Sequence, residues 1–156
     1  MLELLFHNPI IPKPAGKIFT NPKNGKSWIT MGHEWQNAKD KAILEIKEQL
    51  PPGHKPFSRV AGLVMKINLK PSYKGGRKDI FNLLNFPPDV LSQSGVWVDD
   101  NETCVDSVVS WISRNNSGVS IVWICETIDE YIDKIDQYKT TLRQIDKFTK
   151  DREPKI

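Results

Sequence analysis

Carboxylates gather around one stretch of the sequence, residues 78–100, KDIFNLLNFPPDVLSQSGVWVDD. Asp79 follows a basic stretch, and Asp99 and Asp100 close the short apolar run VWV. A strand end and a helix start can converge, so these acids are candidates for one site. Carboxylates within about 4 Å of one another repel by a few kcal/mol at an effective dielectric near 20, and a bound cation offsets that cost. Because oxygen-only ligands favour Mg²⁺, Mn²⁺ or Ca²⁺, the pattern is typical of metal-assisted phosphodiester hydrolysis.

A simpler interpretation of the same acids stays open. Asp79 suits the N-cap of a helix, and Asp99, Asp100 and Asn101 suit a turn. Asp89 follows Pro87 and Pro88, which cannot continue a helix from the preceding turn. We therefore expect a break at Phe86-Pro87 and a restart with Pro88 near the first helical position, which gives Asp89 a structural role in the new first turn.

Basic residues flank the acids and could hold the phosphates of a substrate. Residues 13–26 and 66–78 each contain several cations and no acid. A solvated surface explains either cluster equally well, and a net charge of +3 over 156 residues is too small to indicate nucleic acid by itself. The predicted DNA contacts are Lys23, Lys26, Lys70, Lys74, Arg77 and Lys78.

The stretch resembles the RusA family of Holliday-junction resolvases and related phage endonucleases. The matching residues are Arg77-Lys78, Asp79-Ile80-Phe81-Asn82, Leu83, Asn85, Asp89-Val90-Leu91 and Gly95 to Asp100. A looser similarity covers roughly residues 8–126, because the proline-rich start, the hairpin and the first helix come in the family's order.

This resemblance implies a homodimer that cleaves branched DNA with Mg²⁺, or with Mn²⁺ in its place. Asp79, Asp99 and Asp100 would bind the metal, so Asp79 and Asp100 would be catalytic. Asn82 would orient a ligand or a water from the same helix face as Asp79, since positions i and i+3 are neighbours.

Two departures from the family motif define the alternative hypothesis. Phe81 stands where the family has a second acid, and Asn85 stands where it has a lysine. The alternative is therefore a catalytically degenerate RusA-like protein that binds branched DNA without cleaving it. A third hypothesis is a role in protein assembly through the C-terminal segment.

The elements that must position these residues give a mixed α/β (α+β) fold. We expect a mixed sheet, two main helices and an added C-terminal helix, with a RusA-like domain over residues 1–126 and a helical extension over 127–156. The predicted elements are a hairpin around NPKNG, a helix over 33–50, a half-buried strand over 60–70, a helix from Asp79, a strand at 96–98 and a strand hairpin of 104–113 with 119–125.

The C-terminal extension begins with a capping box, with Thr127 as N-cap and Glu130 three residues later. Apolar residues then follow at spacings of three and four, namely Ile128, Tyr131, Ile135, Tyr138, Leu142 and Ile145. The pattern predicts either a long helix lying on the domain or a coiled-coil contact in a dimer.

The cysteines and the absence of a long apolar run indicate the compartment. Cys104 and Cys125 lie in predicted strands without a CxxC motif, so we expect buried thiols. The sequence shows no signal peptide and no membrane span, which predicts a cytoplasmic protein of a bacterial or phage-infected cell with no membrane partner.

Overall fold

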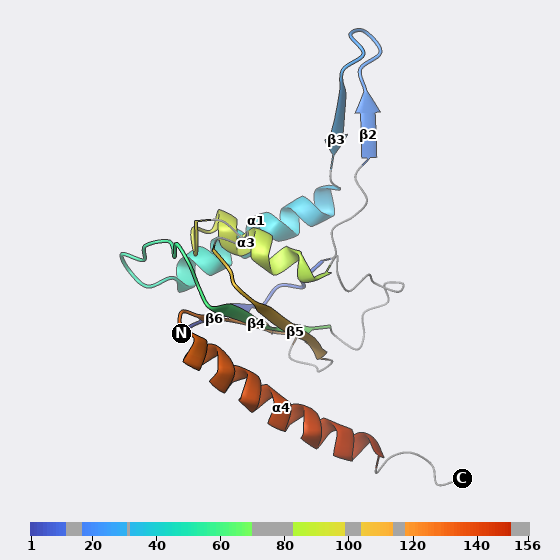
Figure 1. Cartoon of the computed structure of the whole chain (residues 1–156). Helices are drawn as coiled ribbons and strands as arrows, with labels where there is room; N and C mark the ends of the chain where they lie inside the picture. Colours follow the sequence, from blue (N-terminus) through green and yellow to red (C-terminus); the bar gives the residue numbers. More distant parts are fainter. Residues whose placement is uncertain (12–16, 31, 70–82, 99–103, 114–117, 151–156) are drawn as a thin grey trace, which may run out of the picture.

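The computed structural model describes residues 1–11, 17–30, 32–69, 83–98, 104–113 and 118–150. These residues form an α+β fold, as the sequence predicts, built on a four-stranded mixed sheet with the strand order β1-β6-β4-β5. The strands of the sheet are β1 (Leu2–Phe6), β4 (Gly62–Asn68), β5 (Val108–Ser113) and β6 (Ser120–Cys125). Helices α1 (His33–Gln49) and α3 (Phe86–Gln93) cover one face, and α4 (Ile128–Lys150) lies against the other (Figure 1).

Strand β4 is the centre of the molecule and is buried on both faces. Leu63, Met65 and Ile67 join the main core under α1 and α3, while Val64 joins a second cluster under α4. The alternation was predicted correctly, but the expectation of a half-buried strand was wrong. Its second face is covered because α4 folds back over it.

The predicted strand hairpin of residues 104–113 and 119–125 is also wrong. β4 lies between the two strands, pairing in parallel with β5 and antiparallel with β6. A parallel pair cannot be joined by a tight turn. The chain therefore crosses from β4 to β5 by way of α3, which makes β4-α3-β5 a βαβ unit.

Helix α1 agrees with the predicted range to within one residue. Trp35, Ala42 and Ile46 are buried at helical spacing, as the periodicity predicts. The helix ends at Gln49, and Leu50 is already extended before Pro51.

Helix α3 begins at Phe86, two residues before the predicted restart at Pro88, and the prolines do interrupt the predicted helix from Asp79. The break falls at Asn85, and Phe86, Pro87 and Pro88 form the first turn. A first turn needs no N–H donors, so prolines are tolerated there. Asp89 completes this turn, as expected, and lies 4.0 Å from the Nζ atom of Lys39 on α1.

The strand pairing differs from the local predictions in three places. β1 was not predicted, and it pairs antiparallel with β6 along Leu2–Phe6. The predicted strand at 96–98 is only a single bridge between Trp97 and Phe57. Cys104 precedes a bridge at Val105 and is not in a strand, but both cysteines are buried and neither forms a disulfide, as expected.

Helix α4 starts with the predicted capping box and packs on the sheet by its first half. The N–H of Glu130 donates to Oγ1 of Thr127 over 3.3 Å, and the N–H of Thr127 donates back to Oε2 of Glu130 over 3.4 Å. Tyr131 and Ile135 pack into the second cluster, whereas Ile128, predicted to share their seam, is 59% exposed. The interpretation as a helix lying on the domain is thus confirmed for this half.

Over the described residues, no helix is long and apolar enough to span a bilayer.

Candidate functional site

The predicted acidic site lies outside the described residues. Asp79 and Asn82 fall in the segment 70–82, and Asp99 and Asp100 fall in the segment 99–103. The predicted phosphate contacts Lys70, Lys74, Arg77 and Lys78 also lie outside the described part of the chain. Within that part, no three His, Cys, Asp or Glu side chains are grouped so that they could hold a metal ion.

Both acidic segments are attached to α3, which is firmly anchored. Leu83, the first described residue after segment 70–82, is 1% exposed in the main core. Beyond the other end of the helix, Trp97 is 1% exposed, and its Nε1–H donates to Oγ of Ser92 over 2.7 Å. The N–H of Val96 donates to the carbonyl of Leu91 over 3.1 Å. Leu83 and Trp97, which lie on either side of α3 along the chain, therefore anchor the chain close to both segments.

The predicted hairpin around NPKNG is confirmed. β2 (Lys17–Thr20) pairs antiparallel with β3 (Ser27–Thr30), and the ribbon projects away from the sheet (Figure 1). Asn21 and Asn24 accept the N–H groups of Lys23 and Lys26 over 2.8 and 3.0 Å, as expected for Asx turns. Gly25 takes a φ of 67°, which a residue with a side chain rarely adopts.

The hairpin presents an aromatic pair and two cations to solvent. The rings of Phe19 and Trp28 stack with centroids 6.2 Å apart, although the residues are 46% and 49% exposed. Lys23 and Lys26 at the tip are exposed as well. Exposed aromatic rings beside lysines are the combination that unpaired or distorted nucleic acid requires, since bases stack and phosphates need positive charge.

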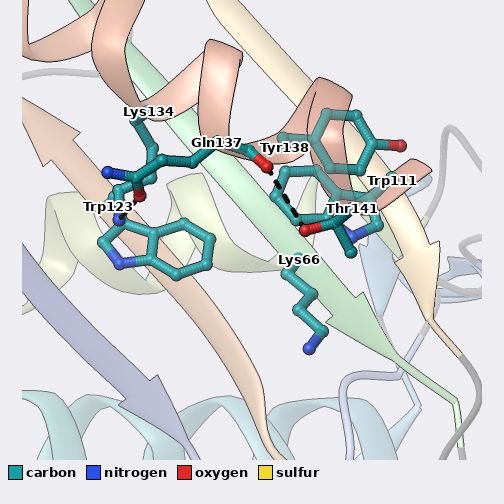
Figure 2. A pocket seen from close by; sticks show the side chains of 7 residues that line it. All are labelled: Lys66, Trp111, Trp123, Lys134, Gln137, Tyr138 and Thr141. Carbon is teal, nitrogen blue, oxygen red and sulfur yellow. Dashed lines mark hydrogen bonds between the residues drawn. The ribbon is translucent and has the colours of Figure 1, made fainter. Parts of the chain in front are cut away.

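A second candidate site lies between the sheet and α4, and we call it the aromatic groove (Figure 2). The groove has a volume of about 220 Å³. Its lining residues come from β4, β5, β6 and α4, and they are Lys66, Trp111, Trp123, Lys134, Gln137, Tyr138 and Thr141.

The sheet register explains why these side chains meet. Lys66 is the Cα partner of Trp111 on β5, and Val64 is the Cα partner of Trp123 on β6, so all four share one face. The planes of the two indoles differ by only 17°, with centroids 6.0 Å apart. Together they form a broad aromatic surface beside the half-buried Lys66.

Helix α4 lays polar and aromatic groups over this surface. The ring of Tyr138 stacks on Trp111 with centroids 3.6 Å apart, and burial raises the pKa of its hydroxyl. The Nζ atom of Lys134 lies 4.4 Å from the ring centroid of Trp123, within range of a cation–π interaction. That ammonium also donates to Oε1 of Gln137 over 3.1 Å (Figure 2).

The groove has an excess of positive charge. Over the described residues, neither Lys66 nor Lys134 forms an ion pair with a carboxylate. Glu3 on the edge strand accepts a hydrogen bond of 2.6 Å from Nε1 of Trp123. Chemically, the groove is suited to a flat ring that carries a negative charge.

Sequence reasoning missed the groove because its parts are far apart along the chain. In the sequence, Lys66 belongs to the basic stretch 66–78, and Trp123 stands in the apolar strand predicted over 119–125. Trp123 is indeed only 9% exposed, but it also lines the groove. The available signal was a lysine in the middle of an apolar strand.

Comparison with known proteins adds no assignment, because no family model and no curated protein matches the chain.

Proposed function

We propose that the chain is a Mg²⁺-dependent, structure-selective endodeoxyribonuclease that cleaves branched DNA such as Holliday junctions. Asp79 and Asp100, with Asp99 beside them, would bind the cation, and Asn82 would orient a ligand or a water. The metal would activate the attacking water and neutralise charge that develops on the phosphate. Mn²⁺ could replace Mg²⁺ with the same oxygen ligands.

The observation that carries the proposal is the basic, aromatic hairpin. Phe19 and Trp28 are stacked but half exposed, and Lys23 and Lys26 stand at the tip of the same projecting ribbon. Residues 17–30 contain no acid to neutralise them. An exposed apolar pair of this kind is a binding feature, and the lysines select a phosphate-bearing partner.

The position of α3 between the two acidic segments of the sequence supports the proposed metal site. Segments 70–82 and 99–103 precede and follow α3 along the chain, and this helix of eight residues spans only about 12 Å. The short stretches of chain from Leu83 to Asp79 and from Val98 to Asp100 are compatible with acids of the two segments sharing a cation. Asp89, which pairs with the buried Lys39, is not among the proposed ligands.

The proposal includes a homodimer in the cytoplasm of a bacterial or phage-infected cell. A four-way junction has two-fold character, and a C₂ dimer offers it two sites. The alternative function is junction binding without cleavage, which Phe81 and Asn85 favour because neither can replace the acid or the lysine of the family motif.

The test incubates the purified protein with a synthetic four-way junction, a linear duplex of the same sequence, and Mg²⁺, Mn²⁺ or EDTA. Asp100→Asn removes a proposed metal ligand, and Asp133→Asn on the exposed side of α4 is its matched control. We expect metal-dependent nicking of the junction that Asp100→Asn abolishes and Asp133→Asn preserves.

Binding is measured in the same samples with EDTA. Lys23→Ala combined with Lys26→Ala should weaken junction binding and flatten its salt dependence, whereas Lys41→Ala combined with Lys47→Ala on the exposed face of α1 should not. Tight junction binding without cleavage in either metal would favour the degenerate alternative. No preference for DNA of any form would refute both functions.

A further inference from the structure

A lysine on the central strand of a sheet is an unusual neighbour for two tryptophans. Lys66 lies in β4 between β5 and β6, and its cross-strand partners are Trp111 and Ile121. Lysine is rarely placed in such a position unless its charge is paired. Among the described residues no carboxylate pairs with it, and its side chain lines the aromatic groove.

The groove is shaped for a small group rather than for a second helix. Its volume of about 220 Å³ is below the roughly 300–1,000 Å³ typical of pockets that enclose a drug-sized ligand. One aromatic ring with a charged substituent is the size that suits it. Trp111 and Trp123 supply the apolar walls, and Lys66 and Lys134 supply the charge.

These groups match a nucleotide better than other anions. Proteins that bind single strands combine a positively charged groove with aromatic side chains that pack against bases. The polar atoms at the α4 side, from Gln137 and Thr141, add hydrogen-bonding groups at the edge of the groove (Figure 2). An aliphatic carboxylate would use the lysines but would make no use of the aromatic walls.

We propose that the aromatic groove binds one unpaired nucleotide of a DNA strand. The base packs against Trp111 and Trp123, and its phosphate lies between the ammonium groups of Lys66 and Lys134. In the sequence, the strand that carries Lys66 is followed by the basic stretch 70–78.

The inference rests on the proposed function and extends it, because a base pair at a branch point opens more easily than one inside a continuous duplex. It gives α4 a role in substrate binding that is separate from the acids at residues 79 and 100. Binding is therefore measured without divalent metal, so that a failure of cleavage and a failure of this inference can be told apart.

The probe is a fluorescein-labelled ten-residue oligothymidylate, followed by fluorescence polarisation against the full chain in EDTA. Lys66→Met retains most of the aliphatic stem and removes the charge, and Lys47→Met on exposed α1 is its control. We expect Lys66→Met to weaken binding and to reduce the slope of log K against log salt by about 0.7, the value for one phosphate contact on a single strand. Lys47→Met should change neither quantity.

A second variant, Trp111→Ala, tests the aromatic wall. Loss of one stacking partner should weaken binding by roughly 5- to 150-fold. Circular dichroism of each variant checks that it is folded. A blunt duplex should compete poorly with the probe, and Asp133→Asn should bind the probe as well as the wild type.

Equal affinity and equal salt slope for Lys66→Met and Lys47→Met would overturn the inference. So would competition by the duplex as strong as by the single strand. If the junction is never cleaved but the probe shows the expected dependence on Lys66, the nuclease proposal fails and the groove assignment stands.

Discussion

The contact between Gly62 and Tyr131 determines whether α4 can lie on the sheet. A Cβ atom at Gly62 would meet Cδ2 and Cε2 of Tyr131 at 2.4 Å, which is closer than Cβ atoms come to other atoms. Tyr131 cannot move aside freely, because it is 6% exposed and its hydroxyl shares a hydrogen bond of 2.7 Å with Oγ of Ser107. Gly62→Ala should therefore overpack this interface.

The expected cost of Gly62→Ala is about 2 kcal/mol, within the roughly 1–3 kcal/mol typical of overpacked sites. For a chain of this size it corresponds to a fall in Tm of about 4–8 °C. In a Tyr131→Ala background the clash is gone, and the same substitution should stabilise by up to about 1 kcal/mol, because alanine restricts the unfolded chain. The coupling between the two sites should thus reach about 2–3 kcal/mol.

Urea unfolding followed by circular dichroism measures this double-mutant cycle. Gly32→Ala is the control, because a Cβ there meets nothing within 4 Å. Its effect should be the same whether residue 131 is tyrosine or alanine. If Gly62→Ala also has the same effect in both backgrounds, then Tyr131 does not rest on Gly62 and the proposed geometry of the groove fails with it.

Three further substitutions test other contacts. Asp89→Asn should destabilise the fold by roughly 1–3 kcal/mol in urea unfolding, because it leaves the buried Lys39 without its carboxylate, and Lys39→Met should reduce that cost. Thr127→Ala should lower the free energy of unfolding by about 0.5–2 kcal/mol in the same assay, since it removes the N-cap of α4. The hydrogen bond from the Met1 amine, helped by backbone N–H groups, lowers the pKa of the Glu130 carboxyl. A carboxyl whose pKa is lower in the folded state stabilises the fold at pH values above its ordinary pKa, and this stabilisation is lost as the pH falls towards the folded-state pKa. The melting temperature should therefore fall more steeply between about pH 5 and pH 3 for the wild type than for Glu130→Gln.

Local patterns predicted the elements whose signals are contained within one segment. The helix over 33–50 was found from its apolar spacing and the prolines that end it, and the hairpin at NPKNG was found from its turn residues. The capping box at Thr127 fixed the start of α4. In each case the interactions that form the element join residues close together in the sequence.

Pairing between distant strands could not be predicted in the same way. The strands at 108–113 and 120–125 are adjacent in sequence, so a hairpin was expected, yet β4 is inserted between them. β1 has little local signal and is held by its register with β6. The second face of β4 was expected to face solvent because the segment that covers it, α4, begins sixty residues after the strand ends.

The two candidate sites also differ in whether their residues are close together in the sequence. The acids at 79, 99 and 100 were proposed from a motif, which is local, and they stay a prediction because their segments lie outside the described residues. The aromatic groove was not proposed from the sequence, since its parts converge only when the sheet order and α4 are known.

The position of Lys66 is the strongest reason to regard the groove as a site. On the same face of β4, Val64 joins the second cluster and is fully buried beneath α4. A leucine at position 66 would extend that cluster between Trp111 and Ile121 and seal α4 more firmly onto the sheet, adding about 1.5–3 kcal/mol if fully buried. Lysine does not provide this stabilisation and instead places a charge beside the aromatic surface. Such an arrangement weakens a structural core but favours an anionic ring, so binding explains the composition of this face better than packing does.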